Sequence, residues 1–329
     1  MSRNVCITAS EGNTGFLIGE LLMTDPAFKS QITSVTCLAM NPDHDRCKEL
    51  GKLGAKIVRH RFGRVRDTVK TLKETKADTL CLVPPAHRDK VDITIELIEA
   101  AKKANVPNVL FLSAAGCDLA ERNTQPRLRE FIDLEARFMK TMGDPTTSTG
   151  NSPAIIRSGF YAENLLLYSP QAQEEGLLPI PIGRNHKFPP VALGDVAQLA
   201  ANVLAGKGKH GFNDKHRGQL MVMTGPTLLT GDELAKAASE ALGAKMEFED
   251  VNENEARRVL RDSEADESEV QYLLEYYSLV REGKTNYIST NTFHDVTGVH
   301  PQEPPDFFKT YRDEFLPKRP AKKPKVDGK

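Results

Sequence analysis

The sequence has almost no net charge, no long apolar run and no paired spacing of its cysteines. Its 329 residues carry a formal net charge of -1, so we expect neither nucleic acid nor a membrane as a partner. No apolar run reaches the roughly 18 residues that a membrane span needs. Because the strand-like pattern begins at Asn4, we also expect no signal peptide.

The five cysteines show neither a disulfide pattern nor metal-ligand spacing, so we expect reduced thiols in a reducing, cytoplasmic compartment. They are Cys6, Cys37, Cys47, Cys81 and Cys117. The sequence also lacks a Ser/His/Asp order and a P-loop, and we expect no metal site. Hydrolase, kinase and metalloenzyme functions therefore have no support.

What the first half does contain is a repeat of short apolar strands and helical segments. Strands are predicted at Asn4–Thr8, Val35–Met40, Ala55–His60, Thr79–Pro84 and Asn108–Ala114. Between them, helical spacing covers Gly15–Met23, Asp45–Leu53, Val65–Thr75 and Val91–Ala104. This alternation predicts an α/β fold of Rossmann type, a doubly wound parallel sheet. Ligands of such sheets bind beyond the carboxyl ends of the strands.

The second half predicts a smaller α/β lobe. Its expected elements are a strand leading into a loop at Ala154–Leu166, a hairpin-like Pro/Gly segment, a helix from about Asp195 to Leu204, a capped helix at Thr230–Leu242 and a helical stretch at Asn252–Gly283. We therefore expect a dinucleotide-binding domain at 1–152. Residues 153–315 would hold the remaining Rossmann elements and a substrate lobe, and 316–329 a disordered basic tail that could act as a nuclear signal.

The loop after the first strand, "ASEGNTG", resembles a phosphate-binding turn. Ala9, Gly12 and Gly15 stand at the three glycine positions of the Rossmann fingerprint. Since Ala9 adds a methyl group, we expect this residue to keep a negative φ. Glu11 would repel a pyrophosphate if its side chain faced the ligand, and would be harmless if it turned to solvent. The loop residues expected to hold a dinucleotide are Ala9, Gly12, Asn13, Thr14 and Gly15.

Further motifs follow the same order as in a known family. They are "CLAMNP", "LCLVPP", "IELIEAAKKANVPNVLFLSAAG", "IIRSGFYAENLL", "LPIPIGRNHKFPPVALGDVAQLAANVLA" and "YYSLVREG" with "FHDVTG". Together with the glycine loop, the chain from Val5 to Tyr311 resembles the NmrA-like group of atypical short-chain dehydrogenases/reductases. The resemblance implies an NADP cofactor, with NAD as the alternative, and a small organic substrate. That group contains reductases and also non-catalytic cofactor sensors that act on protein partners.

Two departures from the family pattern concern the cofactor and the chemistry. Met40, followed by Asn41, stands where the family carries an arginine for the 2′-phosphate of NADP. The basic run "RHRFGR", with Arg59 and Arg61, is either a solvated edge or a substitute anchor for that phosphate. Phe131 stands where family reductases carry a lysine, and no lysine is predicted close to Tyr161.

The remaining candidates follow strands four to six. Pro84 and Pro85 would border the cofactor, and Ser113 would lie near the nicotinamide unless its hydroxyl only satisfies backbone. Tyr161 is the best candidate for a proton donor, although an aromatic residue that packs at the rim is the alternative. The expected substrate-binding residues are His87, Tyr161, Asn164 and His186. The sequence thus leaves two functions open, an NAD(P)H-dependent oxidoreductase and a nucleotide-sensing regulator.

Overall fold

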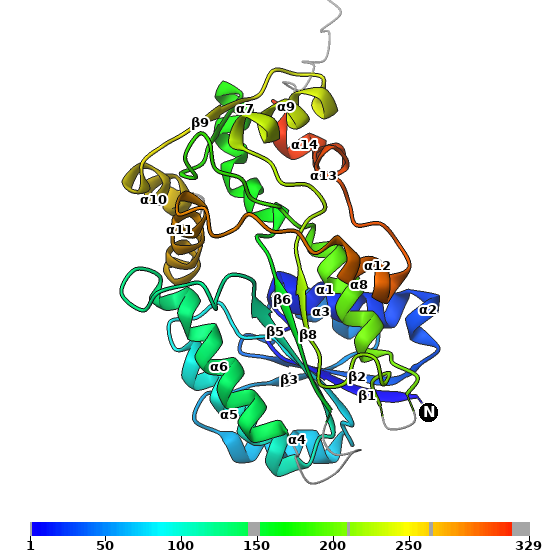
Figure 1. The fold of residues 1–329 in the computed structure, drawn as a ribbon. Helices are drawn as coiled ribbons and strands as arrows, with labels where there is room; N and C mark the ends of the chain where they lie inside the picture. Colours follow the sequence, from blue (N-terminus) through cyan, green and yellow to red (C-terminus); the bar gives the residue numbers. More distant parts are fainter. Residues whose placement is uncertain (1, 144–151, 209–210, 263–265, 318–329) are drawn as a thin grey trace, which may run out of the picture.

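The computed structural model describes residues 2–143, 152–208, 211–262 and 266–317. Seven parallel strands form one sheet in the order β3-β2-β1-β4-β5-β6-β8 (Figure 1). Their bounds are β1 Arg3–Ile7, β2 Ile32–Ala39, β3 Lys56–Arg59, β4 Thr79–Leu82, β5 Asn108–Ala114, β6 Ser152–Ser158 and β8 Leu220–Met223. The strand order reverses between β1 and β4, and a ligand crevice is expected beyond the carboxyl ends there. The predicted doubly wound sheet is confirmed.

Helices cover both faces of this sheet (Figure 1). One face packs against α1 Asn13–Thr24, α2 Pro26–Lys29, α3 Asp45–Lys52, α8 Leu193–Leu204 and α12 Thr290–Thr297. The other face packs against α4 Val65–Glu74, α5 Lys90–Ala104 and α6 Pro126–Met142. Strands β4 and β5 are buried on both faces, which explains why they read as continuous apolar runs instead of alternating ones.

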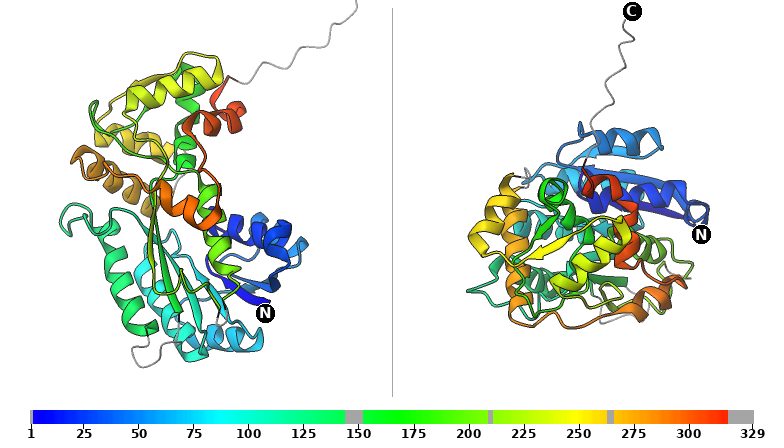
Figure 2. Two further views of the ribbon diagram at one scale, coloured as in Figure 1. Left: turned by 45° about the vertical axis from the view of Figure 1, so that its right-hand side comes forward. Right: turned by 90° about the horizontal axis from the view of Figure 1, so that it is seen from above.

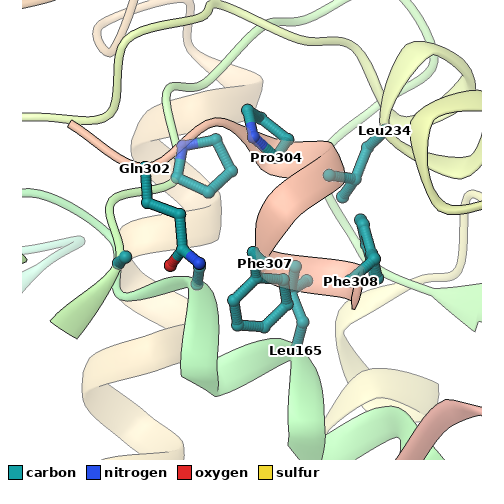
Figure 3. Close-up of a pocket in the computed structure, with 9 residues that line it drawn as sticks. Leu165, Leu234, Gln302, Pro304, Phe307 and Phe308 are labelled. Carbon is teal, nitrogen blue, oxygen red and sulfur yellow. The ribbon is translucent and has the colours of Figure 1, made fainter. Parts of the chain in front are cut away.

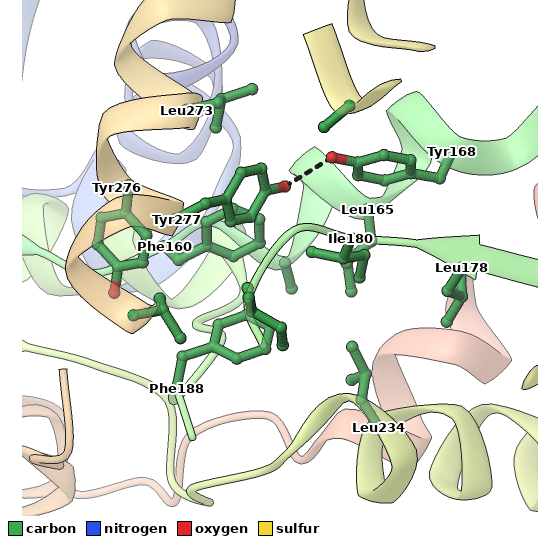
Figure 4. Packing of buried hydrophobic residues seen from close by; sticks show 14 of the residues in the cluster. Phe160, Leu165, Tyr168, Leu178, Ile180, Phe188, Leu234, Leu273, Tyr276 and Tyr277 are labelled. Carbon is green, nitrogen blue, oxygen red and sulfur yellow. Dashed lines mark hydrogen bonds between the residues drawn. The ribbon is translucent and has the colours of Figure 1, made fainter. Parts of the chain in front are cut away.

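The rest of the second half forms a smaller lobe above the carboxyl edge of the sheet (Figure 2). Its elements are the 3-10 helix η1 Ala162–Tyr168, α7 Ser169–Glu175, β7 Leu177–Pro179, α9 Gly231–Leu242, β9 Glu247–Glu249, α10 Glu253–Asp262, α11 Glu267–Arg281, α13 Pro304–Thr310 and α14 Arg312–Phe315. Aromatic side chains fill its core (Figure 4). There the Tyr168 hydroxyl donates to that of Tyr277 over 3.0 Å, which satisfies two buried polar groups.

The local signals of the second half give mixed results. The Thr230 side chain and Glu233 form the predicted capping box of α9, and Gly243 ends that helix in the left-handed region. The predicted hairpin is wrong, because β7 pairs in parallel with β9 from far along the chain. The main sheet also takes in four elements of the second half, namely β6, β8, α8 and α12. The predicted domain boundary between residues 152 and 153 stays a prediction.

All five cysteines are free and buried, in agreement with the expectation of reduced thiols. No helix in the described part of the chain is long and apolar enough to cross a membrane. The basic tail beyond Pro317 lies outside the described residues, so its disorder and its nuclear role stay predictions, as does a cytoplasmic location.

Candidate active site

A cleft of about 630 Å³ runs across the carboxyl ends of β1, β4, β5 and β6 and reaches α11 of the smaller lobe. This volume is typical of a small-molecule site. The cleft brings together most of the residues predicted from the sequence. These are Ala9, Gly12, Asn13, Thr14, Gly15, Pro84, Pro85, His87, Ser113, Phe131, Tyr161 and Asn164.

The glycine loop keeps a backbone shape that suits a phosphate. Gly12 is the N-cap of α1 and has no side chain to satisfy the first amides of the helix, so they remain open to an anion. A Cβ at Gly15 would lie 2.6 Å from the Ala9 carbonyl oxygen, so only glycine fits there. The expectation for Ala9 is wrong, since its φ is +47°. The residue adopts the left-handed conformation of a glycine, at a cost of about 1–2 kcal/mol.

Glu11 does not face the cleft. Its Oε1 accepts hydrogen bonds from the amides of Met40, at 2.8 Å, and Asn41, at 3.2 Å. The loop thereby brings a carboxylate to the end of β2, where the sequence shows no acidic residue. A carboxylate at this place favours a free ribose hydroxyl and disfavours a 2′-phosphate. Met40 and Asn41 themselves are not among the described residues that line the cleft.

The basic run after β3 does not enter the cleft either. Arg59 donates to Asp43 Oδ2 over 3.2 Å and to the Met40 carbonyl, while Arg61 is exposed and does not line the cleft. Arg46 does line it, and its Nη1 donates to the Glu11 carbonyl oxygen over 3.2 Å. The sequence analysis missed Arg46. Its position in the first turn of α3, the helix that follows β2, could have indicated a basic residue at the carboxyl edge of the sheet.

A buried ionic network lies behind the ends of β5 and β6. Glu135 of α6 accepts from Arg157 Nε and Nη2 at 2.8 and 2.7 Å, and from the Ser113 hydroxyl at 2.5 Å. These hydrogen bonds raise the pKa of the Arg157 guanidinium above its ordinary value. Ser113 therefore gives its proton to a side chain rather than to backbone, and its oxygen remains free to accept. Asp118 also pairs with Arg157 at 2.9 Å.

The Tyr161 hydroxyl lies 2.9 Å from Ser158 Oγ at the end of β6. Burial raises the Tyr161 pKa in spite of the hydrogen bonds with Ser158 and Thr14, which lower it, so the phenol is a weak acid. Next to it, Glu163 accepts from the Leu193 amide over 2.8 Å, and burial raises its pKa as well. Tyr161 and Asn164 line the cleft from this side.

A lysine that the sequence analysis did not single out lies beside Phe131. Lys90 of α5 places its ammonium nitrogen 4.2 Å from the centre of the Phe131 ring, and both residues line the cleft. Tyr272 of α11 packs edge-on against the Phe131 ring, and the two ring centres lie 6.1 Å apart. Because α5, α6 and α11 are distant in sequence, no local motif announces this contact.

His186 is not brought into the cleft. Its ring lies against Gly183 in the same loop, where a Cβ on the glycine would approach Nδ1 to 2.5 Å. A second hollow, between η1 and α13, holds only about 10 Å³ and is lined by Leu165 and Phe307 among others (Figure 3). It has room for one water molecule at most and is no ligand site. The described residues contain no cluster that could hold a metal ion.

No family model matches the sequence. The chain is 25% identical over 202 residues to an NAD(P)H azoreductase of Xenophilus azovorans, which covers 61% of the chain and 64% of that enzyme. The chain thus spans less than two thirds of the azoreductase. It is 24% identical to quinone oxidoreductase 2 of Escherichia coli, over 78% of the chain and 81% of that protein.

Solved structures share the fold over nearly the whole chain. The crystal structure of the Escherichia coli NADPH-dependent quinone oxidoreductase with NADPH superposes with a TM-score of 0.74 at 19% identity, covering 93% of this chain and 99% of the other. NmrA, a negative transcriptional regulator crystallised with NADP, superposes with a TM-score of 0.70 at 13% identity, covering 94% of each chain. The predicted resemblance to the NmrA-like group is confirmed in the fold, which this chain shares with NAD(P)-binding reductases.

Proposed function

We propose that this chain is an NAD(P)H-dependent oxidoreductase that reduces a small conjugated organic acceptor. One observation carries the proposal: a single cleft joins the open amides of α1 to an apolar wall from the second lobe. The first part suits a pyrophosphate, and the second suits a flat apolar molecule. A purely nucleotide-sensing protein has no need of the second part.

The residues present fit the cofactor. The cradle of Gly12 and Gly15 would accept the pyrophosphate, because side chains there would fill the space that it needs. Arg46 would lie at the adenosine end, whereas Pro84 and Ser113 would border the nicotinamide. When bound, the reduced nicotinamide supplies a hydride. Weak binding of NADP is expected, because the carboxylate of Glu11 stands at the end of β2.

The acceptor would lie between the ends of β5 and β6 and helix α11. Phe131, Leu167 and Tyr272 form its apolar wall, and Tyr161 and Asn164 offer polar hydrogens. The wall suits a quinone, an enone or an azo compound, and the similarity to an azoreductase and a quinone oxidoreductase supports the same class. We propose that Tyr161 donates a hydrogen bond to the acceptor, while the oxygen of Ser113 accepts one from the nicotinamide amide.

The test has two stages. Calorimetric titration of the purified chain with NADPH and NADH measures the affinity for each nucleotide. The loss of reduced-nucleotide absorbance is then followed with a panel of quinones, enones, imines and azo dyes. We expect turnover with at least one conjugated acceptor. Nucleotide binding without turnover on any acceptor would contradict the proposal and favour the sensor alternative, in which a protein partner responds to nucleotide.

A further inference from the structure

We propose that Lys90 is the acid of this cleft, the group that gives a proton to the acceptor as it is reduced. The inference rests on the proposed oxidoreductase function and names the residue that completes the reaction. It also predicts a substrate class, namely conjugated acceptors with an oxygen or nitrogen that becomes negative on reduction.

The placement of Lys90 is unusual for a lysine. It is the first residue of α5, directly beyond the β4 end of the cleft, and its side chain is 9% exposed. Lys90 is the only lysine among the described residues that line the cleft. Its ammonium lies over the face of the Phe131 ring, which holds the charge at the apolar wall. A buried ammonium at the edge of a ligand cleft is costly, so a plain structural role would be better served by an apolar residue.

The groups around Lys90 leave its charge partly uncompensated. Glu130 of α6 lies 3.0 Å away, and the Arg127 carbonyl accepts a hydrogen bond over 2.9 Å. Glu130 is shared, however, because Arg127 Nη1 lies 3.6 Å from its other oxygen. Glu275 of α11 adds a weaker attraction, and burial raises the pKa of that carboxyl. Burial outweighs these attractions and lowers the pKa of Lys90 below its ordinary value, which makes its ammonium a stronger acid than that of an exposed lysine.

Two other polar groups of the cleft, Tyr161 and His87, differ from Lys90 as donors. The Tyr161 phenol has a raised pKa. His87 accepts a hydrogen bond from the Asp89 amide at Nδ1 over 3.1 Å, so its neutral form can donate only from the other nitrogen. Lys90 alone combines a proton, a positive charge and burial against the apolar wall.

The step balances without a further reactant. On reduction the acceptor gains a hydride, which is one proton with two electrons, and its terminal oxygen or nitrogen becomes an anion. One N–H bond of the Lys90 ammonium breaks and an O–H or N–H bond of the product forms. The neutral amine that remains takes a proton from water before the next turnover. The rate therefore depends on protonated Lys90, and it falls as pH rises through the lowered pKa of this group.

Three variants test the assignment. Lys90→Met removes the charge and keeps the length of the side chain, Lys90→Arg keeps the charge without a titrating proton, and Lys103→Met is the control on the same helix. Lys103 is exposed, and its ion pair within the described part of the chain is with Glu99 at 3.7 Å. We expect both Lys90 variants to lower kcat for quinone reduction by about 10²-fold and to lose the alkaline decline in rate. The Lys103 variant and the affinity for nucleotide should not change.

A binding measurement separates charge from proton transfer. 2-Hydroxy-1,4-naphthoquinone is an anion at neutral pH, and its affinity for the chain without nucleotide can be measured by calorimetry. Lys90→Met should weaken its binding about tenfold, whereas Lys90→Arg and the neutral 1,4-naphthoquinone should show little change. The exchange Lys90→Met with Phe131→Lys should restore part of kcat, since the new lysine lies beside the vacated position.

The outcomes are distinct. If wild-type protein reduces a quinone and Lys90→Met keeps kcat and the alkaline decline, the Lys90 assignment fails and the oxidoreductase function stands. Full recovery of kcat in Lys90→Arg would mean that charge suffices and that Lys90 donates no proton. A wild-type chain that binds nucleotide and reduces nothing would overturn both proposals. Thermal unfolding of each variant shows whether a lost rate reflects a lost fold.

Discussion

The two ends of the cleft differ in the groups that shape them. At the glycine-loop end, backbone amides and the close packing of Gly15 on Ala9 shape the site, and side chains can vary. At the acceptor end, a buried network of side chains, including Glu135 and Arg157, sets the geometry. Because backbone groups form the phosphate site, its shape is kept even though Ala9 and Glu11 stand at positions where the Rossmann fingerprint usually has other residues. A side-chain site tolerates little, because each removed partner leaves a buried group unsatisfied.

The largest effect should come from the buried network. Arg157→Met leaves the Glu135 carboxylate buried without its partner, so we expect a loss of about 3–5 kcal/mol in the free energy of unfolding, measured in denaturant. The matched control is Arg137→Met, which removes an exposed pair with Glu99 and should cost about 0–1 kcal/mol. Equal losses in the two variants would show that the acceptor end does not depend on this network.

The next effect concerns Tyr161. Tyr161→Phe removes the hydroxyl and leaves the ring, and we expect kcat to fall about tenfold through the loss of one hydrogen bond to the acceptor. Tyr168→Phe provides the comparison, because the Tyr168 hydroxyl bonds to that of Tyr277 in the lobe core and Tyr168 is not among the described residues that line the cleft. An unchanged kcat in Tyr161→Phe would leave this residue with a packing role at the rim.

At the nucleotide end, changes of charge should have smaller effects that depend on the 2′-phosphate. Glu11→Thr removes the carboxylate at the end of β2, so we expect the affinity for NADPH to rise about fivefold relative to NADH, measured by calorimetry. The opposite change, Arg46→Ala, should weaken NADPH more than NADH.

The control for the Glu11 and Arg46 variants is a change at two arginines that do not line the cleft. Arg59→Ala combined with Arg61→Ala should leave both affinities unaltered, because neither residue lines the cleft. A selective loss of NADPH binding in that double variant would revive the substitute anchor after β3. No response to Glu11→Thr would mean that the carboxylate is too far from the phosphate to matter.

The smallest effect is expected at the chain end. Truncation after Pro317 removes basic residues outside the described fold, so we expect the free energy of unfolding to change by less than about 0.5 kcal/mol. A truncated chain that distributes in cells like the full-length protein would argue against the nuclear signal. A large loss of stability would show that the tail docks.

The sequence revealed what is encoded locally. The period of apolar residues located β1 to β6 of the sheet but not β8, and the box of Thr230 and Glu233 located the start of α9. It could not reveal that Glu11 reaches the amides after β2, because that contact depends on the positive φ of Ala9 and on the turn. Lys90 stayed hidden for another reason, since its partners come from α6 and α11. A parallel sheet brings together residues that no spacing in the chain connects.

The burial of the cysteines has a chemical consequence for the proposed substrates. Quinones and enones add to thiolates, so an enzyme that handles them is exposed to alkylation by its own substrate. Here every thiol is buried, and burial raises the pKa of Cys47 to about 11 and that of Cys37 and Cys117 to about 12. Even Cys117, which lies beside Glu135, thus stays a protonated and unreactive thiol at neutral pH. Buried thiols would protect the chain from alkylation by the proposed acceptors.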